Sequence, residues 1–166
     1  MSFDSAAGEV FVRKALTSDI DAIYAIELAS FSDPWSKYFF NHSMAQDTEI
    51  VFAAVSSDRI VGYGCLSVLP PEGEILNIAV SPEERGRGVG QLLLTAMLNH
   101  AAGEGVDTVF LEVRESNTAA RSLYEKNGFS PIGIRKNYYI KPTEDAVVMR
   151  KSPLLADAGC IFEERS

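Results

Sequence analysis

The clearest chemical signal in the sequence is the run Arg85-Gly86-Arg87-Gly88-Val89-Gly90. Alternating glycines let successive backbone N–H groups point into one concavity, and a helix that follows adds the positive end of its dipole. The two arginines raise the local positive potential further. The run therefore favours a pyrophosphate ligand, with a glycine-rich helix entry that binds nothing as the alternative.

The spacing of this run excludes two common nucleotide motifs. A dinucleotide fingerprint would need a glycine at position 91, where the chain has Gln91. A P-loop would need lysine and then a hydroxyl residue after Gly90, and neither is present.

A second block with chemical potential covers residues 111–129 and holds Glu112 and Tyr124. Glu112 lies in an otherwise apolar strand, on the face opposite Leu111 and Val113. Amide formation from an amine and a thioester needs a neutral amine, a stabilised oxyanion and a protonated leaving thiolate. We expect Glu112 to accept the amine proton, Tyr124 to donate one, and a backbone N–H of 78–80 to support the oxyanion. On residue type alone, an edge-facing glutamate and a core tyrosine remain the alternatives.

The pKa values of the candidate amines indicate which kind of amine is the acceptor. An α-amino group has a pKa of about 8, whereas that of a lysine amine is about 10.4. A weak carboxylate base acting through water therefore suits a peptide N-terminus better than a lysine side chain.

Periodicity and capping signals predict the elements that position these residues. We expect an α/β fold with one mixed sheet, in the order β-α-α-β-β-β-α-β-α-β-β. A helix capped by Thr17 or Ser18 buries one face, made of Ile20, Ile23, Tyr24 and Leu28. The remaining expected elements are strands 9–15, 50–55, 60–68, 74–80, 107–113, 129–135 and 146–150, and helices 36–45, 89–100 and 117–127.

Composition narrows the class of protein. The 166 residues carry a formal net charge of −8, which disfavours nucleic acid. The charge suits a cationic partner, with a role in solubility alone as the alternative. No apolar run approaches the ~20 residues that span a bilayer, and the first residues do not resemble a signal peptide, so we expect a cytoplasmic protein without a membrane partner. Cys65 and Cys160 lie far apart without nearby histidines, so no metal site is implied.

The segment EILNIAV followed by SPEERGRGVGQLLL resembles the acetyl-CoA motif of the GNAT superfamily, R/Q-x-x-G-x-G/A. Arg85, Gly88 and Gly90 occupy its defined positions. The resemblance implies a single-domain GNAT fold with acetyl-CoA as co-substrate. It further implies that the loop holds the CoA pyrophosphate and that a strand edge pairs with the pantetheine arm; the residues concerned are Arg85, Gly86, Arg87, Gly88, Val89 and Gly90, and Ile78, Ala79 and Val80.

The block LEVRESNTAARSLYEKNGF is similar to the RimI subgroup of ribosomal-protein alanine N-acetyltransferases. That resemblance implies that Glu112 is the base and Tyr124 the acid. It also implies that Asn117 contacts the pantetheine arm and that Arg121 reaches the nucleotide end.

Two further segments resemble the parts of this subgroup that flank a peptide groove: 31–36 (FSDPWS), and 135–139 (RKNYY) with 144–146 (EDA). The resemblance implies that Trp35, Tyr138 and Tyr139 contact the substrate. It also implies that Glu144 or Asp145 neutralises a cationic amine or a basic side chain. A core tryptophan and a solvated acidic hairpin are the alternatives.

These features together predict a domain over 9–151, with 1–8 and 152–166 as terminal segments for which we expect disorder. The expected activity is transfer of acetyl from acetyl-CoA to a protein N-terminus, with a basic ribosomal protein that begins with alanine as substrate. One alternative keeps the chemistry but uses a lysine side chain or a small-molecule amine. Another is a non-catalytic acyl-CoA-binding module.

Overall fold

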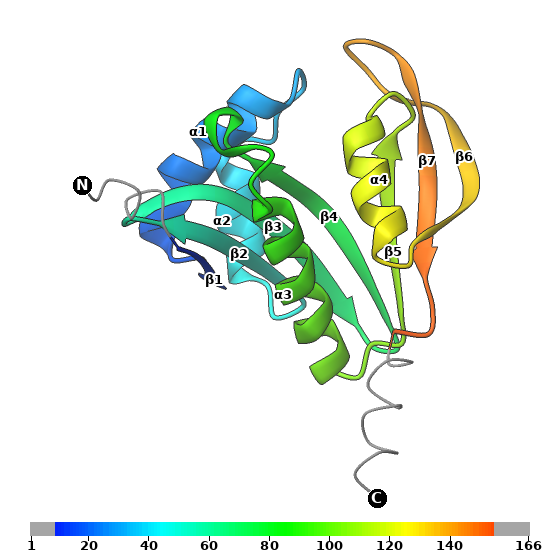
Figure 1. Cartoon of the computed structure of the whole chain (residues 1–166), viewed down its shortest axis with the longest axis horizontal. Helices are drawn as coiled ribbons and strands as arrows, with labels where there is room; N and C mark the ends of the chain where they lie inside the picture. The colour runs from blue at the N-terminus through cyan, green and yellow to red at the C-terminus, as the bar shows by residue number, and fades with distance from the viewer. Residues whose placement is uncertain (1–8, 155–166) are drawn as a thin grey trace, which may run out of the picture. The chain divides into compact units, whose positions relative to one another are not determined.

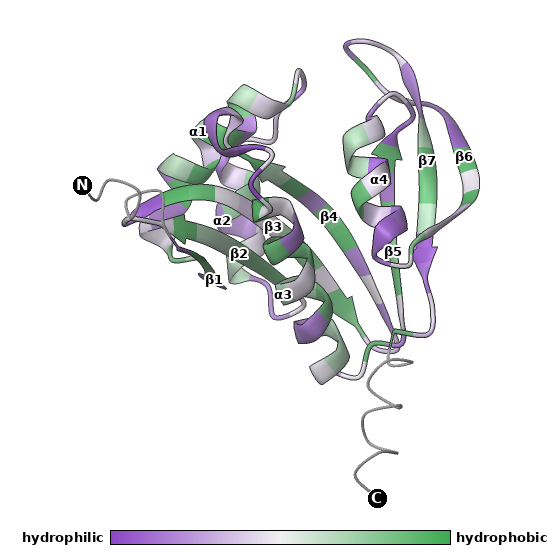
Figure 2. Ribbon diagram, viewed as in Figure 1, coloured by the Kyte–Doolittle hydropathy of each residue, from purple (hydrophilic) through white to green (hydrophobic). Residues whose placement is uncertain are grey.

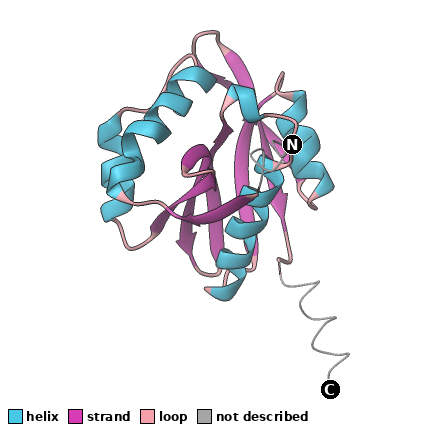
Figure 3. Cartoon of the chain, turned by 60° about the vertical axis from the view of Figure 1, so that its left-hand side comes forward, coloured by secondary structure: helices cyan, strands magenta, loops and turns pink. Residues whose placement is uncertain are grey.

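The computed structural model of the chain describes residues 9–154, so most of the predicted terminal segments lie outside the described part. The predicted order of elements is confirmed, with two short 3₁₀ turns added in the described residues. Figure 3 shows the helices and strands in separate colours. The elements are β1 (Val10–Lys14), η2 (Thr17–Asp19), α1 (Ile20–Ser30), α2 (Lys37–Ala45), β2 (Glu49–Ser56), β3 (Arg59–Leu69), β4 (Glu72–Val80), η3 (Pro82–Glu84), α3 (Val89–Gly103), β5 (Thr108–Arg114), α4 (Thr118–Lys126), β6 (Ser130–Tyr139) and β7 (Glu144–Lys151).

The strands form the predicted mixed sheet, in the order β1-β2-β3-β4-β5-β7-β6. β4 and β5 pair in parallel, whereas β1 with β2, β2 with β3, β5 with β7 and β7 with β6 pair antiparallel. The chain divides into two compact units. The first unit runs up to Ser67 and includes Leu76–Met97; the second includes Val68–Ile75 and the chain from Leu98 onward.

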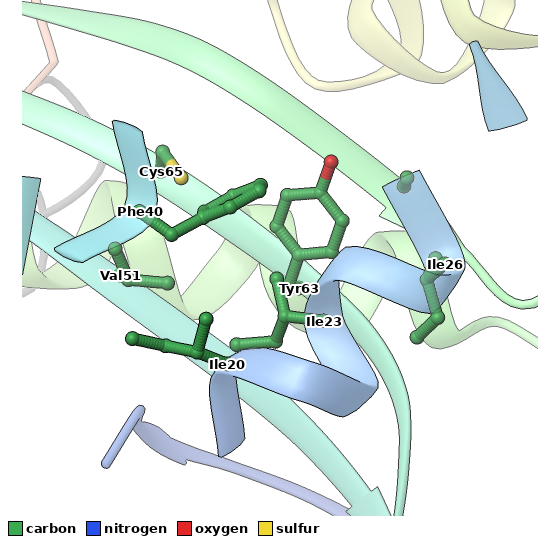
Figure 4. Packing of buried hydrophobic residues seen from close by; sticks show 8 residues of the cluster. Ile20, Ile23, Ile26, Phe40, Val51, Tyr63 and Cys65 are labelled. Atoms are coloured by element: carbon green, nitrogen blue, oxygen red, sulfur yellow. The ribbon is translucent and has the colours of Figure 1, made fainter. Parts of the chain in front are cut away.

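The core of the first unit lies between its first two helices and the strands β2 and β3 (Figure 4). Ile23 of α1, Phe40 of α2 and Tyr63 of β3 are fully buried there, together with Val51 and Cys65. β2 is hydrophobic along most of its length (Figure 2), as expected for a strand that is covered on both faces.

Helix α3 covers the opposite face of β3, where Gly62 and Gly64 alternate with Tyr63 and Cys65 (Figure 1). A Cβ atom on Gly64 would lie 2.5 Å from the Met97 sulfur, and one on Gly62 would lie 3.0 Å from the Ala79 carbonyl oxygen. The two glycines therefore allow α3 and β4 to approach β3 closely.

Two details of α1 differ from the expectation. Neither Thr17 nor Ser18 caps α1, because both lie in the 3₁₀ turn η2; Asp19 is the N-cap residue, and its carboxylate accepts the Leu16 N–H at 2.7 Å without bonding to the helix. The expected apolar face is also wrong at Leu28, which is 51% exposed, whereas Glu27 is 1% exposed. The helix is rotated so that Ile20, Ile23 and Glu27 point inward, and Glu27 finds hydrogen-bond donors there.

The second unit is built on β5, β7 and β6, with α4 between β5 and β6 in the chain. Asn117 caps α4 by accepting the Ala120 N–H at 3.1 Å, and Gly128 ends it with a φ of +93°. β6 and β7 extend past the predicted ends because Tyr139 pairs with Glu144, which leaves only residues 140–143 as the connecting turn. Leu154, beyond the predicted domain end, is buried.

No helix within residues 9–154 is long and apolar enough to cross a membrane.

Candidate functional site

The loop between β4 and α3 has the backbone that the glycine spacing predicts. Gly86 and Gly88 have φ values of +80° and +83°, a region that side chains disfavour. Apart from its chain neighbours, no atom of residues 9–154 lies within 4 Å of a Cβ placed on either residue, so the space beside the loop is open. α3 starts at Val89, and the first N–H groups of a helix lack partners within the helix. The loop thus has the backbone form that suits an anionic ligand.

Arg85 fixes this loop to its surroundings. Its Nε donates to the Val80 carbonyl oxygen at 3.0 Å, and its guanidinium donates to the Ser30 hydroxyl at 3.1 Å. Arg87 is exposed and lies 3.4 Å from Glu84. Arg85 therefore ties the loop to β4 and α1, while Arg87 faces solvent.

The edge of β4 at 78–80 follows Asn77, whose side chain bonds in two directions. Asn77 Oδ1 accepts the Ile78 N–H at 3.2 Å, and Asn77 Nδ2 donates to Glu27 Oε1 at 2.9 Å. Ala79 is buried, whereas Ile78 and Val80 are partly exposed. The Ile78 N–H is thus already engaged by a side chain.

Trp35 lies between α1 and α2 and is half-buried. Its ring packs against Phe39 and Phe40, with centroids 6.0 and 5.7 Å apart. Its backbone N–H donates to Glu27 Oε2 at 2.8 Å. Both the ring and the backbone of Trp35 are therefore held in place.

Glu27 is the residue that the sequence analysis missed. Its carboxylate accepts hydrogen bonds from Trp35, from Asn77 and from the Tyr63 hydroxyl. Burial raises the pKa of Glu27, and these three donors oppose that shift. The spacing of Ile20, Ile23 and Glu27, at i, i+3 and i+7, was the signal that could have identified it.

Glu112 lies on β5, whose residues alternate between buried and half-buried as predicted. Its Oε2 atom is 3.4 Å from Arg135 Nε, and within the described residues this atom makes no hydrogen bond. The pKa of Tyr138 is raised by burial and by the Glu112 charge. Burial and the Glu112 charge likewise raise the pKa of Glu74. The half-buried carboxylate is thus placed beside Arg135 and Tyr138, and its charge also acts on Glu74 and Tyr139.

Tyr124 is 5% exposed and lies on α4. Its ring packs edge-on against Phe129, with centroids 5.8 Å apart. Burial raises the pKa of the Tyr124 phenol, and the neighbouring Tyr139 adds to the shift. The phenol therefore keeps its proton at neutral and mildly alkaline pH.

The structure gives Asn117 and Arg121 roles within the second unit. The Asn117 side chain caps α4, and Arg121 donates to the Glu115 carbonyl oxygen at 3.0 Å. Arg121 Nε is buried and makes no hydrogen bond within the described residues, so this guanidinium retains an unused donor.

Arg114 organises the β6–β7 hairpin. Its guanidinium lies 4.4 Å from the Tyr139 ring centroid and 3.1 Å from Glu144 Oε1. The second Glu144 oxygen accepts the Ser116 N–H at 2.6 Å, and the bonds to Ser116 and Arg114 lower the pKa of Glu144. Burial and the Glu112 charge raise the pKa of Tyr139 to about 12. Glu144 is thus engaged in holding the hairpin.

The predicted residues fall into two groups by unit. The first unit holds the 85–90 loop, the 78–80 edge and Trp35; the second holds Glu112 with Tyr138, and Tyr124 with Tyr139.

The chain is similar to known proteins both in sequence and in fold. A model of the acetyltransferase (GNAT) family matches residues 20–129. The ribosomal protein bS18-alanine N-acetyltransferase of Haemophilus ducreyi is 35% identical to the chain, over 83% of this chain and 97% of that protein. The corresponding enzyme of Salmonella typhimurium is 38% identical, over 80% of this chain and 90% of that protein. The crystal structure of the Escherichia coli ribosomal-protein-S18-alanine N-acetyltransferase superposes with a TM-score of 0.81, at 32% identity, over 87% of this chain and 94% of that one.

Proposed function

This chain belongs to the GNAT acetyltransferase family, and from that premise we propose that it transfers the acetyl group of acetyl-CoA to the N-terminal α-amino group of a ribosomal protein that begins with alanine. The observation that supports this substrate is the similarity to two ribosomal protein bS18-alanine N-acetyltransferases. The chain covers at least 90% of the length of each of these relatives.

We assign the pyrophosphate of the co-substrate to the 85–90 loop. Two positive-φ glycines, open space beside them and the start of α3 favour an anion there. Bound acetyl-CoA supplies the thioester carbonyl that the amine attacks. We place the oxyanion donor at the N–H of Ala79 or Val80, since the Ile78 N–H donates to Asn77.

We assign the two proton transfers to the second unit. Glu112 takes a proton from the α-ammonium group, directly or through one water, so that the neutral amine can attack. Tyr124 donates its phenolic proton to the departing thiolate, and its raised pKa keeps that proton available. Asn117 and Arg121 are assigned to the pantetheine arm and the nucleotide end, and Arg121 has an unused buried donor for such a contact.

We assign the recognition of the peptide to Trp35, Tyr138 and Tyr139. Their rings offer rigid apolar surface at low entropic cost. Glu144 supports this surface by holding the hairpin, because both its oxygens are bonded to Arg114 and Ser116.

Mass spectrometry after incubation with acetyl-CoA tests the proposal. The acceptors are Ala-, Ser- and Met-initiated peptides, N-terminally blocked peptides with an internal lysine, and spermidine. We expect acetylation of free N-termini, with Ala preferred. Modification of lysine or spermidine alone would contradict the substrate but not the chemistry. CoA binding without transfer to any acceptor would contradict both.

A further inference from the structure

The buried carboxylate of Glu27 joins three elements of the first unit. Its donors are the Trp35 backbone N–H, the Tyr63 hydroxyl of β3 and the Asn77 amide of β4. None of the ion pairs in residues 9–154 involves Glu27, so its charge is balanced by hydrogen bonds alone. Burying a carboxylate without a cation costs folding free energy, so we look for the role of Glu27 in the segments that its hydrogen bonds position.

What Glu27 holds is the segment around Trp35. This segment belongs to neither helix nor strand, so the Trp35 N–H has no ladder partner and uses the carboxylate as acceptor. The Trp35 ring is connected to the same network. It packs on Phe40, and Phe40 packs edge-on against Tyr63, with ring centroids 5.5 Å apart. The Tyr63 hydroxyl then returns to Glu27. Trp35 is thereby fixed at its backbone and at its ring by one connected network.

The same network reaches the strand assigned to the co-substrate. Asn77 donates to Glu27 through Nδ2 and accepts the Ile78 N–H through Oδ1. The carboxylate therefore links the Trp35 segment to the backbone at the start of the 78–80 edge.

We propose that Glu27 is a positioning residue for the acceptor: it sets the backbone at Trp35 and so presents this segment to the incoming peptide. The inference rests on the proposed function, which places Trp35 at the acceptor. Glu27 does not touch the reacting atoms in this scheme, and its loss should weaken acceptor binding before it affects the co-substrate.

Kinetics on Glu27→Met and Glu27→Gln test this role. Glu27→Met keeps the volume but removes both acceptor oxygens, and we expect the peptide KM to rise about tenfold, with the acetyl-CoA KM changed less than about twofold. Glu27→Gln should give an intermediate rise, since its one oxygen can still accept the Trp35 N–H. Asp19→Asn is the matched control, because Asp19 is also a buried carboxylate that bonds a backbone N–H beside α1. Equal effects of Glu27→Met and Asp19→Asn on the peptide KM would overturn the inference.

The fluorescence of Trp35 provides a second measurement that needs no substrate. Trp35 is the single tryptophan of the chain, so the emission reports on this segment alone. We expect Glu27→Met to shift the emission to the red and to increase acrylamide quenching, and Asp19→Asn to do neither; Glu27→Gln carries the measurement if Glu27→Met does not fold. An unchanged spectrum overturns the inference. If the wild type acetylates only lysine or spermidine, the proposed function fails, while the emission still decides whether Glu27 fixes Trp35.

Discussion

The phenol of Tyr124 is the single group on which the proposed acid step depends. Tyr124→Phe keeps the ring against Phe129 but removes the proton that would go to the thiolate. We expect kcat to fall about 100-fold, within the usual range for loss of general acid catalysis. Acetyl-CoA affinity, measured by calorimetry, should stay within about twofold because the hydroxyl acts on the leaving group only.

The pH profile separates Tyr124 from a general acid with a lower pKa. Burial raises the pKa of its phenol above the ordinary value of about 10, so the acid form persists up to at least that pH. We therefore expect no decline of kcat between pH 8 and pH 10 in the wild type. A decline in that window, or a Tyr124→Phe variant as fast as the half-buried control Tyr24→Phe, would assign the proton to another group.

A second prediction at this scale concerns Glu112 and the acidity of the acceptor. An α-amino group with a pKa of about 8 is about one-tenth neutral at pH 7 and mostly neutral at pH 9. The base is therefore needed less at high pH. We expect Glu112→Gln to lower kcat/KM strongly at pH 7 and about tenfold less strongly at pH 9. Rates with an Ala-initiated peptide at both pH values check this, with exposed Glu125→Gln as the control. A defect of the same size at both pH values would argue against a base.

Single residues show where sequence reasoning works. The period-two pattern placed Glu112 and Leu111 on opposite faces of a strand, and β5 alternates accordingly. Glu27 was not predicted as a buried residue, because its burial depends on hydrogen-bond donors 8, 36 and 50 residues away in the chain. The spacing of Glu27 from Ile20 and Ile23 is compatible with burial, but a local pattern does not show that such donors are present. Apolar periodicity alone therefore favours Leu28 in its place.

At the scale of elements, the loop between β4 and α3 can be tested by its backbone alone. Gly88 has a φ of +83°, and an added methyl group would meet no atom of the described residues beyond its chain neighbours, but it would strain the backbone. We expect Gly88→Ala to destabilise the fold by about 1 kcal/mol, the usual cost of a left-handed conformation. The relief of that strain would displace the N–H groups, so the acetyl-CoA Kd should rise more than tenfold, roughly the loss of one or two charge-assisted hydrogen bonds.

The last residue of α3 supplies a matched glycine. Gly103 has no positive φ, and in the described part of the chain no atom outside its own helix backbone and chain neighbours lies within 4 Å of a Cβ position. Gly103→Ala should stabilise the fold by up to about 1 kcal/mol through its helix propensity and leave the acetyl-CoA Kd unchanged. Urea unfolding and calorimetry measure both quantities. A Gly88→Ala variant that binds acetyl-CoA like Gly103→Ala would remove the loop from the cofactor site.

Element types were predicted well because hydrophobic periodicity is local, although the cap at Thr17 or Ser18 was wrong. The Asn117 cap and the Gly128 stop of α4 lie at the ends of the helix predicted over 117–127. The ends of β6 and β7 were wrong, since pairing of Tyr139 with Glu144 and the contacts of Arg114 with the hairpin extend both strands. Strand ends depend on cross-strand partners, and a single segment does not encode them.

At the scale of the whole molecule, the fold and family indicate the type of reaction more firmly than the identity of the acceptor. The mixed sheet and the family match are consistent with many amine acceptors, because one fold hosts many substrates. Net charge adds a separate constraint. At −8, the chain attracts cations and repels anions over distances set by the ionic strength.

The salt dependence of the acceptor KM tests whether this charge serves recognition. For an Ala-initiated peptide with two arginines in its first six positions, we expect the KM to rise several-fold, about 3- to 10-fold, between about 0.05 and 0.5 M NaCl, because the Debye length falls from above 10 Å to about 4 Å. A peptide of the same length with glutamines at those positions should have a higher KM at low salt and little salt dependence. Parallel curves for the two peptides would show that the acidic charge contributes to solubility and not to acceptor choice. The acetyl-CoA KM, followed in the same titration, corrects for screening at the 85–90 loop.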